Sequence, residues 1–157
     1  MQFIVGNIFI SPTFKFKGTT YGVKGSAKSH VNDYLPYFLS AYRVTDRFVL
    51  GLNITTIGYG HLDWPINSIV EKSSTLTKVR YERFGLQSSY QITDSLALGV
   101  GFNLESNHQY KLNFVIPSQG NQINSITGVN YTGDLGLYYK IDSNNYLTVA
   151  GYTQLWE

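Results

Sequence analysis

Apolar and polar residues alternate along much of the chain, with the two-residue period of a β-strand. The clearest example lies between residues 95 and 105, where one face carries large apolar side chains and the other carries small and polar ones. No stretch keeps a helical period for more than about two turns. The pattern therefore predicts an all-β protein made of antiparallel strands. The apolar face of the clearest strand consists of Leu96, Leu98, Val100, Phe102 and Leu104.

A strand–turn–strand segment occurs three times, at intervals of about 48 residues, which indicates one repeated supersecondary unit. Its short turns lie near residues 45–46, 93–94 and 142–145 and contain Thr, Asp, Ser and Asn, whose short side chains bond to nearby backbone in turns. We expect a single domain over residues 1–157. The predicted strands span residues 2–17 (one long strand, or two short ones because of Pro12), 32–44, 47–57, 75–92, 95–110, 129–141 and 146–156.

Long polar loops are predicted at residues 18–31, 61–74 and 111–128, so that long and short connections alternate along the chain. Transmembrane β-barrels have this asymmetry, with short periplasmic turns and long outer loops. The tripeptide Gly58-Tyr59-Gly60 interrupts the third strand. Two glycines around one aromatic residue fit a bulge, a kink or the end of the strand.

The composition favours a membrane barrel over a soluble one. Charged residues make up 14% of the chain, against roughly 25% in typical soluble proteins. Apolar runs are too short for a membrane-spanning helix, whereas alternating strands cross a membrane without such runs. Tyr42, Tyr90 and Tyr139 precede the three short turns and suit an aromatic girdle. A soluble barrel or sandwich is the alternative, but we would then expect more Lys and Glu on the polar face.

The polar face of a membrane barrel lines its interior. Tyr138 would offer apolar surface to a ligand there, and Arg83 or Lys140 would meet a carboxylate. Alternatively, the inward carboxylates pair with these two cations. The candidate interior and kink residues are Gly58, Tyr59, Gly60, Arg83, Asn103, Glu105, Tyr138 and Lys140, with Asp134 as a further inward charge.

Catalytic and metal chemistry is not indicated. The chain has no cysteine, and His30, His61 and His108 fall in or beside predicted loops without partners at metal-ligand spacing. We interpret them as solvated loop residues. Ser106 beside His108 is the only local pair resembling a hydrolase site, and such pairs arise by chance. We therefore predict no enzyme activity and no cofactor, and the scattered net charge of +2 indicates no nucleic-acid partner.

Four segments, in order along the chain, resemble the FadL-type outer-membrane transporters of long-chain fatty acids and hydrocarbons. They read ISPTFKFKGT, YRVTDRFVLGLNITTIGYG, SSYQITDSLALGVGFNLE and GDLGLYYKIDSNNYLTVAGYT. The resemblance implies a 14-stranded up-and-down barrel plugged by an N-terminal hatch domain. It also implies that ligands leave sideways through an opening at an inward kink of the third strand. The matching position here is Thr55 to Gly60.

Two departures from the family pattern shape the expected function. The hatch with its Asn-Pro-Ala motif and the second half of the barrel are missing, so we interpret the chain as about seven strands of a larger barrel. The expected function is outer-membrane transport of long-chain fatty acids or other hydrophobic small molecules in a Gram-negative bacterium. The expected partners are that ligand, membrane lipid and lipopolysaccharide. The alternatives are a small structural or adhesive outer-membrane barrel and a soluble lipid-binding β-barrel.

Overall fold

The computed structural model describes residues 1–156, apart from the side chains of His108, Gln109 and Trp156. Within this part of the chain all regular structure is β-strand, and no helix is long and apolar enough to cross a membrane. The strands are β1 (Gln2–Ile10), β2 (Thr13–Thr20), β3 (Val23–His30), β4 (Asp33–Arg43), β5 (Phe48–Asp63), β6 (Leu76–Gln91), β7 (Leu96–Ile116), β8 (Gly120–Lys140) and β9 (Tyr146–Trp156).

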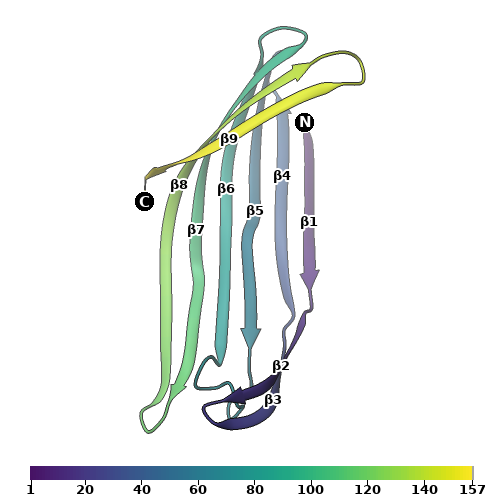
Figure 1. The fold of residues 1–157 in the computed structure, drawn as a ribbon. Coiled ribbons are helices and arrows are strands. Elements are labelled where there is room, and N and C mark those ends of the chain that lie inside the picture. Colours follow the sequence, from purple (N-terminus) through teal and green to yellow (C-terminus); the bar gives the residue numbers. More distant parts are fainter. Residues whose placement is uncertain (157) are drawn as a thin grey trace.

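Seven of these strands form one antiparallel sheet in the order β1-β4-β5-β6-β7-β8-β9. The sheet is long and curved, and the short turns gather at one end of it (Figure 1). The remaining strands, β2 and β3, form a separate hairpin at the opposite end. The order is that of an up-and-down meander, which confirms the predicted fold class: an antiparallel sheet that forms part of a barrel.

The three repeated turns have the same hydrogen-bond pattern, as their sequence similarity predicted. In each turn, one side-chain oxygen accepts bonds from the backbone N–H groups two and three residues later. Thr45 Oγ1 lies 3.3 and 3.0 Å from its two donors, Thr93 Oγ1 3.3 and 3.1 Å, and Asp142 Oδ1 2.8 and 2.9 Å. These turns set the register of three hairpins, because each turn fixes which residues of its two strands face each other.

Several predicted boundaries were wrong, mostly at the end of the sheet away from the short turns. For residues 2–17, the structure has the alternative of two strands, since β1 and β2 are separated at Pro12, although β2 continues to Thr20. The predicted loop at residues 18–31 is largely β-hairpin. The third strand does not end at Gly58 but continues to Asp63, and the predicted loop at residues 111–128 is the extension of β7 and β8. Strand pairing thus continues beyond the stretch where apolar residues alternate.

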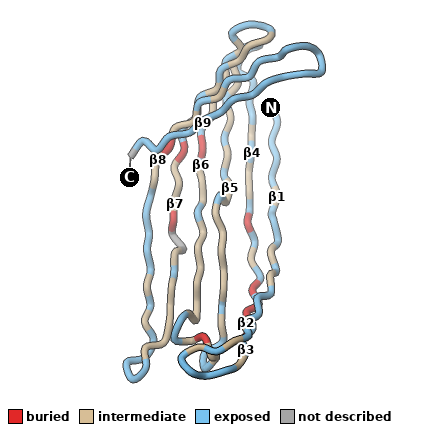
Figure 2. The backbone as a smooth tube through the Cα atoms, viewed as in Figure 1, coloured by how far each residue is buried: buried red, intermediate tan, exposed pale blue. Residues whose placement is uncertain are grey.

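The two faces of the sheet differ as the alternation predicted. Large apolar side chains on the convex face are about half exposed, for example Leu86 at 54% and Leu135 at 58%. On the concave face, Asn103 is 0% and Thr132 3% exposed. Figure 2 shows that only short stretches of the chain are buried. An apolar outer row over a polar inner row is the arrangement of a barrel wall in lipid.

Candidate functional site

The strand register arranges the concave-face residues in rows that run across the sheet. One row joins Asn53, Gly85, Asn103, Thr132 and Gln154, each paired with the next on the neighbouring strand. The adjacent rows contain Arg83 opposite Glu105, and Gln87 opposite Gly101 opposite Asp134. Three of the predicted interior residues, Arg83, Asn103 and Glu105, therefore lie together in the middle of this face.

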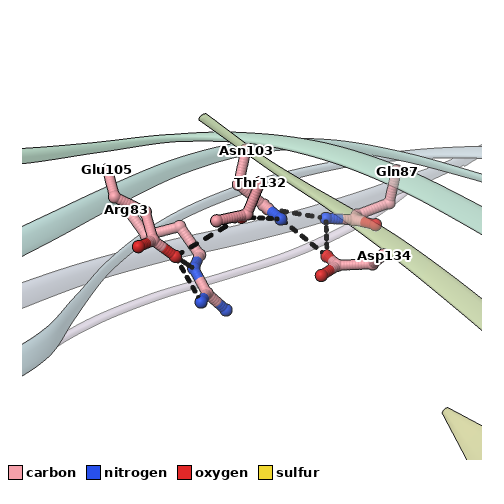
Figure 3. A network of polar contacts seen from close by, with 6 residues as sticks. All are labelled: Arg83, Gln87, Asn103, Glu105, Thr132 and Asp134. Atoms are coloured by element: carbon pink, nitrogen blue, oxygen red, sulfur yellow. Dashed lines mark hydrogen bonds and ion pairs between the residues drawn. The ribbon is translucent and has the colours of Figure 1, made fainter. Parts of the chain in front are cut away.

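Hydrogen bonds connect these rows into a network over β6, β7 and β8 (Figure 3). Arg83 Nε and Nη2 donate to Glu105 Oε1 at 2.9 and 2.5 Å. Asn103 Nδ2 donates to Asp134 Oδ2 at 2.7 Å and to Thr132 Oγ1 at 3.2 Å. Gln87 Nε2 donates to Asn103 Oδ1 at 3.0 Å. Arg83 and Glu105 therefore form an ion pair. Of the two alternatives predicted for Arg83, the structure has pairing with a carboxylate of the chain rather than a cation left free for a ligand.

Glycines make room for this network. A side chain at Gly85 would overlap the side chains of Asn53 and Asn103, and one at Gly101 would overlap that of Gln87. The glycines of the repeated hairpins therefore have a packing role on the concave face. They let long polar side chains from neighbouring strands lie flat across the sheet.

A hollow of about 530 Å³ lies over the concave face beside the network. Its polar wall includes Arg83, Gln87 and Asp134, and glycines and alanine form much of the rest. The volume falls in the range of small-molecule sites, which is about 300–1,000 Å³. The lining thus combines a few polar side chains with small residues.

Tyr138 and Lys140 lie apart from the network, toward the short turns. They line a second hollow of about 340 Å³. The Tyr138 ring stacks on Tyr146 with centroids 5.6 Å apart. The same hollow is lined by Arg43 and Arg47 and by the carboxylates Asp46 and Asp94, so three cationic and two anionic side chains gather at this end.

The tripeptide Gly58-Tyr59-Gly60 lies beside a β-bulge at which the β5–β6 register shifts between Thr56 and Gly58. The structure thus has the bulge that the glycines suggested, without the strand ending there. Pairing between β4 and β5 runs from Arg43 opposite Val49 only as far as Phe38 opposite Ile54. Beyond that point, the two strands are not paired with each other. We call this unpaired stretch, residues 33–37 of β4 and 55–63 of β5, the seam.

Polar side chains cross the seam at its far end. The Asp33 carboxylate accepts a hydrogen bond from Tyr59 Oη at 2.7 Å and contacts His61 Nδ1, and Lys78 Nζ lies 3.8 Å from its other oxygen. The prediction that His61 is a solvated loop residue was wrong: it lies in β5 with a side chain that is 14% exposed. These bonds hold β4 and β5 together where backbone pairing has stopped.

Sequence comparison identifies the family. The family model described as "Outer membrane protein transport protein (OMPP1/FadL/TodX)" matches residues 1–150. The chain belongs to this family. It is accordingly an outer-membrane protein of a transport family. Comparison with curated proteins gave no match.

Comparison of structures supports the same fold. The chain resembles the crystal structure of a Pseudomonas aeruginosa FadL homologue with a TM-score of 0.67 and 13% sequence identity. The match covers 94% of this chain and 40% of that one, so the chain spans less than half the length of the solved protein.

Two groups of site residues were not among the residues predicted for the site, for different reasons. Gln87 and Thr132 could have been predicted from alternation alone, since each lies on the polar face of its strand. Asp33, His61 and Lys78 had no such signal because they fall outside the stretches with clear alternation. His108 lies outside the described side chains, so its predicted solvated position stays a prediction. Among described residues, no cluster of His, Asp and Glu could hold a metal ion.

Proposed function

We propose that the chain forms one side of a barrel that transports hydrophobic small molecules, with long-chain fatty acids as the preferred class, across the outer membrane. The family supports transport in general. The observation that carries the proposal is the seam, where β4 and β5 stop pairing near the β-bulge between Thr56 and Gly58. Unpaired backbone is costly in lipid, so a barrel keeps such a gap only where it is covered or used.

The concave face next to the seam supports a hydrophobic cargo. Leu39 lies opposite Asn53, and Ile4 lies opposite Leu39, so both share the concave face with Asn53. Leu35 and Ile8, which lie opposite each other, are on this face too. This side of the interior is therefore apolar, unlike the polar network over β6 to β8. A hydrocarbon chain moving along it would reach the seam, where it would leave sideways into the membrane past Gly58, Tyr59 and Gly60.

Ligand recognition would combine apolar burial with one ionic contact. Burial contributes about 0.8 kcal/mol per methylene group. Since Arg83 is paired with Glu105, we assign the carboxylate contact to Lys140. Its hollow is lined by three cationic side chains against two carboxylates, which leaves a positive balance for an anionic ligand. Tyr138 would supply apolar surface beside it. Asn103 and Glu105 would then act as supports of the wall rather than as ligand contacts.

A crosslinking experiment tests the seam as the exit. The next pair in register beyond Phe38 and Ile54 would be Tyr37 with Thr55, and the chain has no cysteine. We would introduce cysteines at Tyr37 and Thr55 in the whole barrel, join them with a short thiol crosslinker, and measure uptake of a labelled long-chain fatty acid by cells. Joining Leu39 to Asn53, which already pair, is the matched control.

The proposal predicts that the seam crosslink lowers uptake at least tenfold, that reducing a cleavable crosslinker restores it, and that the control crosslink leaves uptake within twofold. Equal uptake with the seam crosslinked would rule out lateral exit of the ligand at this position. Equal loss in both crosslinked barrels would show that the effect comes from general stiffening of the wall.

A further inference from the structure

The β2–β3 hairpin at the outer end of the sheet has one face that is covered and one that is exposed. Register places Thr13 opposite His30, Lys15 opposite Lys28, Lys17 opposite Ser26, and Thr19 opposite Lys24. All eight residues are exposed. Four lysines therefore project from the same face of a two-stranded ribbon. We call Lys15, Lys17, Lys24 and Lys28 the lysine face.

On the opposite face of the hairpin, the middle of β3 packs against the protein, while Phe14 of β2 stays 45% exposed. Ala27 is 8% and Ser29 0% exposed, and Ser29 Oγ accepts a hydrogen bond from the backbone N–H of Asp63 in β5 at 2.9 Å. Gly25 lies so close to Ile69 that a Cβ atom there would be 3.0 Å from Ile69 Cγ2. The lysine face is consequently held outward by packing behind it.

Both ends of the hairpin are also fixed. Ser11 Oγ donates to Asn32 Oδ1 at 2.7 Å where the hairpin leaves the sheet. At the tip, Tyr21 and Gly22 have positive φ angles of 50° and 80°, as a tight two-residue turn requires. Lys72 Nζ lies 5.6 Å from the centroid of the Tyr21 ring. The four lysines thus sit on a positioned platform rather than on a loose loop.

Within the part of the chain that the structure describes, the lysine face forms no ion pair with a carboxylate. Lys15 lies directly opposite Lys28, and like charges at opposed positions destabilise a strand pair. Among the described residues, the carboxylates that form ion pairs do so with His61, Lys78, Arg80 and Arg83, not with these lysines. The arrangement is therefore suited to an external anion that bridges the opposed ammonium groups.

The position of the hairpin indicates which anion. It begins just after the outer end of β1, where the rings of Phe9 and Tyr34 lie 5.1 Å apart and are both more than half exposed. Exposed aromatic pairs of this kind mark a membrane interface. The short turns lie at the other end, which is the periplasmic one in such barrels, so the hairpin is at the outer surface. The phosphates at that height in the outer leaflet belong to lipopolysaccharide.

We propose that the lysine face binds the phosphate groups of lipopolysaccharide in the outer leaflet beside the barrel. Ammonium groups bind phosphate as compact point charges, and four on one face match an array of phosphates rather than a single one. This inference rests on the outer-membrane location and not on the transported ligand.

The test measures binding of bisphosphorylated lipid A to the whole barrel in detergent at 150 mM salt, a concentration at which diffuse charge effects are screened beyond roughly 8 Å. The variant carries K15Q, K17Q and K28Q. A control variant carries R43Q and R47Q, which removes two positive charges at the opposite end. The same substitutions to arginine, K15R, K17R and K28R, keep the charge. Heat-modified gel mobility checks that each barrel is folded.

The proposal predicts at least tenfold weaker binding for the glutamine variant, with less than twofold change for the control and the arginine variant. It also predicts that unmodified protein binds dephosphorylated lipid A at least tenfold more weakly, a result that does not depend on any variant folding. Equal binding of phosphorylated and dephosphorylated lipid A would overturn it, as would equal weakening in both glutamine variants. Displacement of lipid A by a long-chain fatty acid, but not by inorganic pyrophosphate, would assign the face to carboxylates instead.

Discussion

At the scale of single residues, Asn103 joins the concave-face network. Its amide bonds to Gln87, Thr132 and Asp134, and its side chain is fully buried. Replacing such a residue destabilises the fold mainly because its buried polar partners are left without hydrogen bonds, and this costs more than the lost bonds themselves contribute.

We expect Asn103→Ala to lower the free energy of unfolding by about 1–3 kcal/mol, because Asp134 would lose a close donor. Guanidinium unfolding of the refolded barrel in detergent measures this. Asn121→Ala, at an exposed position of β8, is the matched control and is expected to change stability by less than about 0.5 kcal/mol. Similar losses in both variants would show that the network has no special role.

The assignment of Lys140 leads to a prediction about ligand binding rather than about stability. Lys140→Gln in the whole barrel should weaken binding of a long-chain fatty acid about fivefold, as a partly exposed ionic contact of about 1 kcal/mol would. Binding of the alcohol with the same chain length should not change, because it lacks the carboxylate. Tryptophan fluorescence titration with both ligands separates the two cases. If the acid and the alcohol are affected equally, the assignment of Lys140 fails.

At the scale of elements, the short turns were predicted closely and the outer ends of the strands were not. Thr45, Thr93 and Asp142 occupy equivalent places in a repeat that can be read from the chain, and the same backbone bonds recur at each. The register from the Thr93 turn also puts Arg83 opposite Glu105. Sequence alone could therefore have picked out Arg83 and Glu105 as the pair among the inward charges.

The outer elements gave a weaker signal for a physical reason. Lipid imposes alternation only where a strand crosses the bilayer. Beyond that stretch β7 and β8 stay paired by backbone bonds, which any side chain allows, so residues 111–128 resembled a loop. In β3 of the hairpin, the covered positions hold the small residues Gly25, Ala27 and Ser29, between exposed polar ones. The alternation of β3 is therefore between small and polar residues, and only β2, with Phe14 and Phe16 between lysines, alternates apolar with polar side chains. The bonds of Asp33 across the seam depend on where pairing stops, which no local pattern records.

The third short turn has a testable acid–base property. Hydrogen bonds from the Asn145 side-chain amide and the Asn144 backbone N–H lower the pKa of the Asp142 carboxyl below its ordinary value of 3.8. A lowered pKa means that its contribution to folding is fully present above pH 3.8 and is lost as the pH falls through the lower, folded-state pKa.

Carbon NMR of the Asp142 carboxyl in the folded barrel should give a midpoint below 3.8. Asn145→Ala removes the largest cause and should move that midpoint upward. A midpoint at or above the ordinary value in the unmodified turn, or no response to Asn145→Ala, would contradict the assigned bonds.

At the scale of the whole molecule, the sheet is divided into two faces of different chemistry. The convex face carries exposed apolar side chains, and the concave face carries the network, the hollows and the apolar wall beside the seam. Neither the transport proposal nor the position of the lysine face holds unless the convex face contacts lipid.

The most direct test is a cysteine scan of residues 96–105 in β7, one position at a time, in the whole barrel reconstituted into lipid vesicles. Each cysteine would carry an environment-sensitive fluorophore, quenched either by brominated lipid or by a water-soluble quencher. We predict that Leu96, Leu98, Val100, Phe102 and Leu104 are quenched by lipid, and that Ala97, Gly99, Gly101 and Glu105 are quenched from water. Quenching with the opposite phase, or without a two-residue period, would contradict the membrane-barrel account.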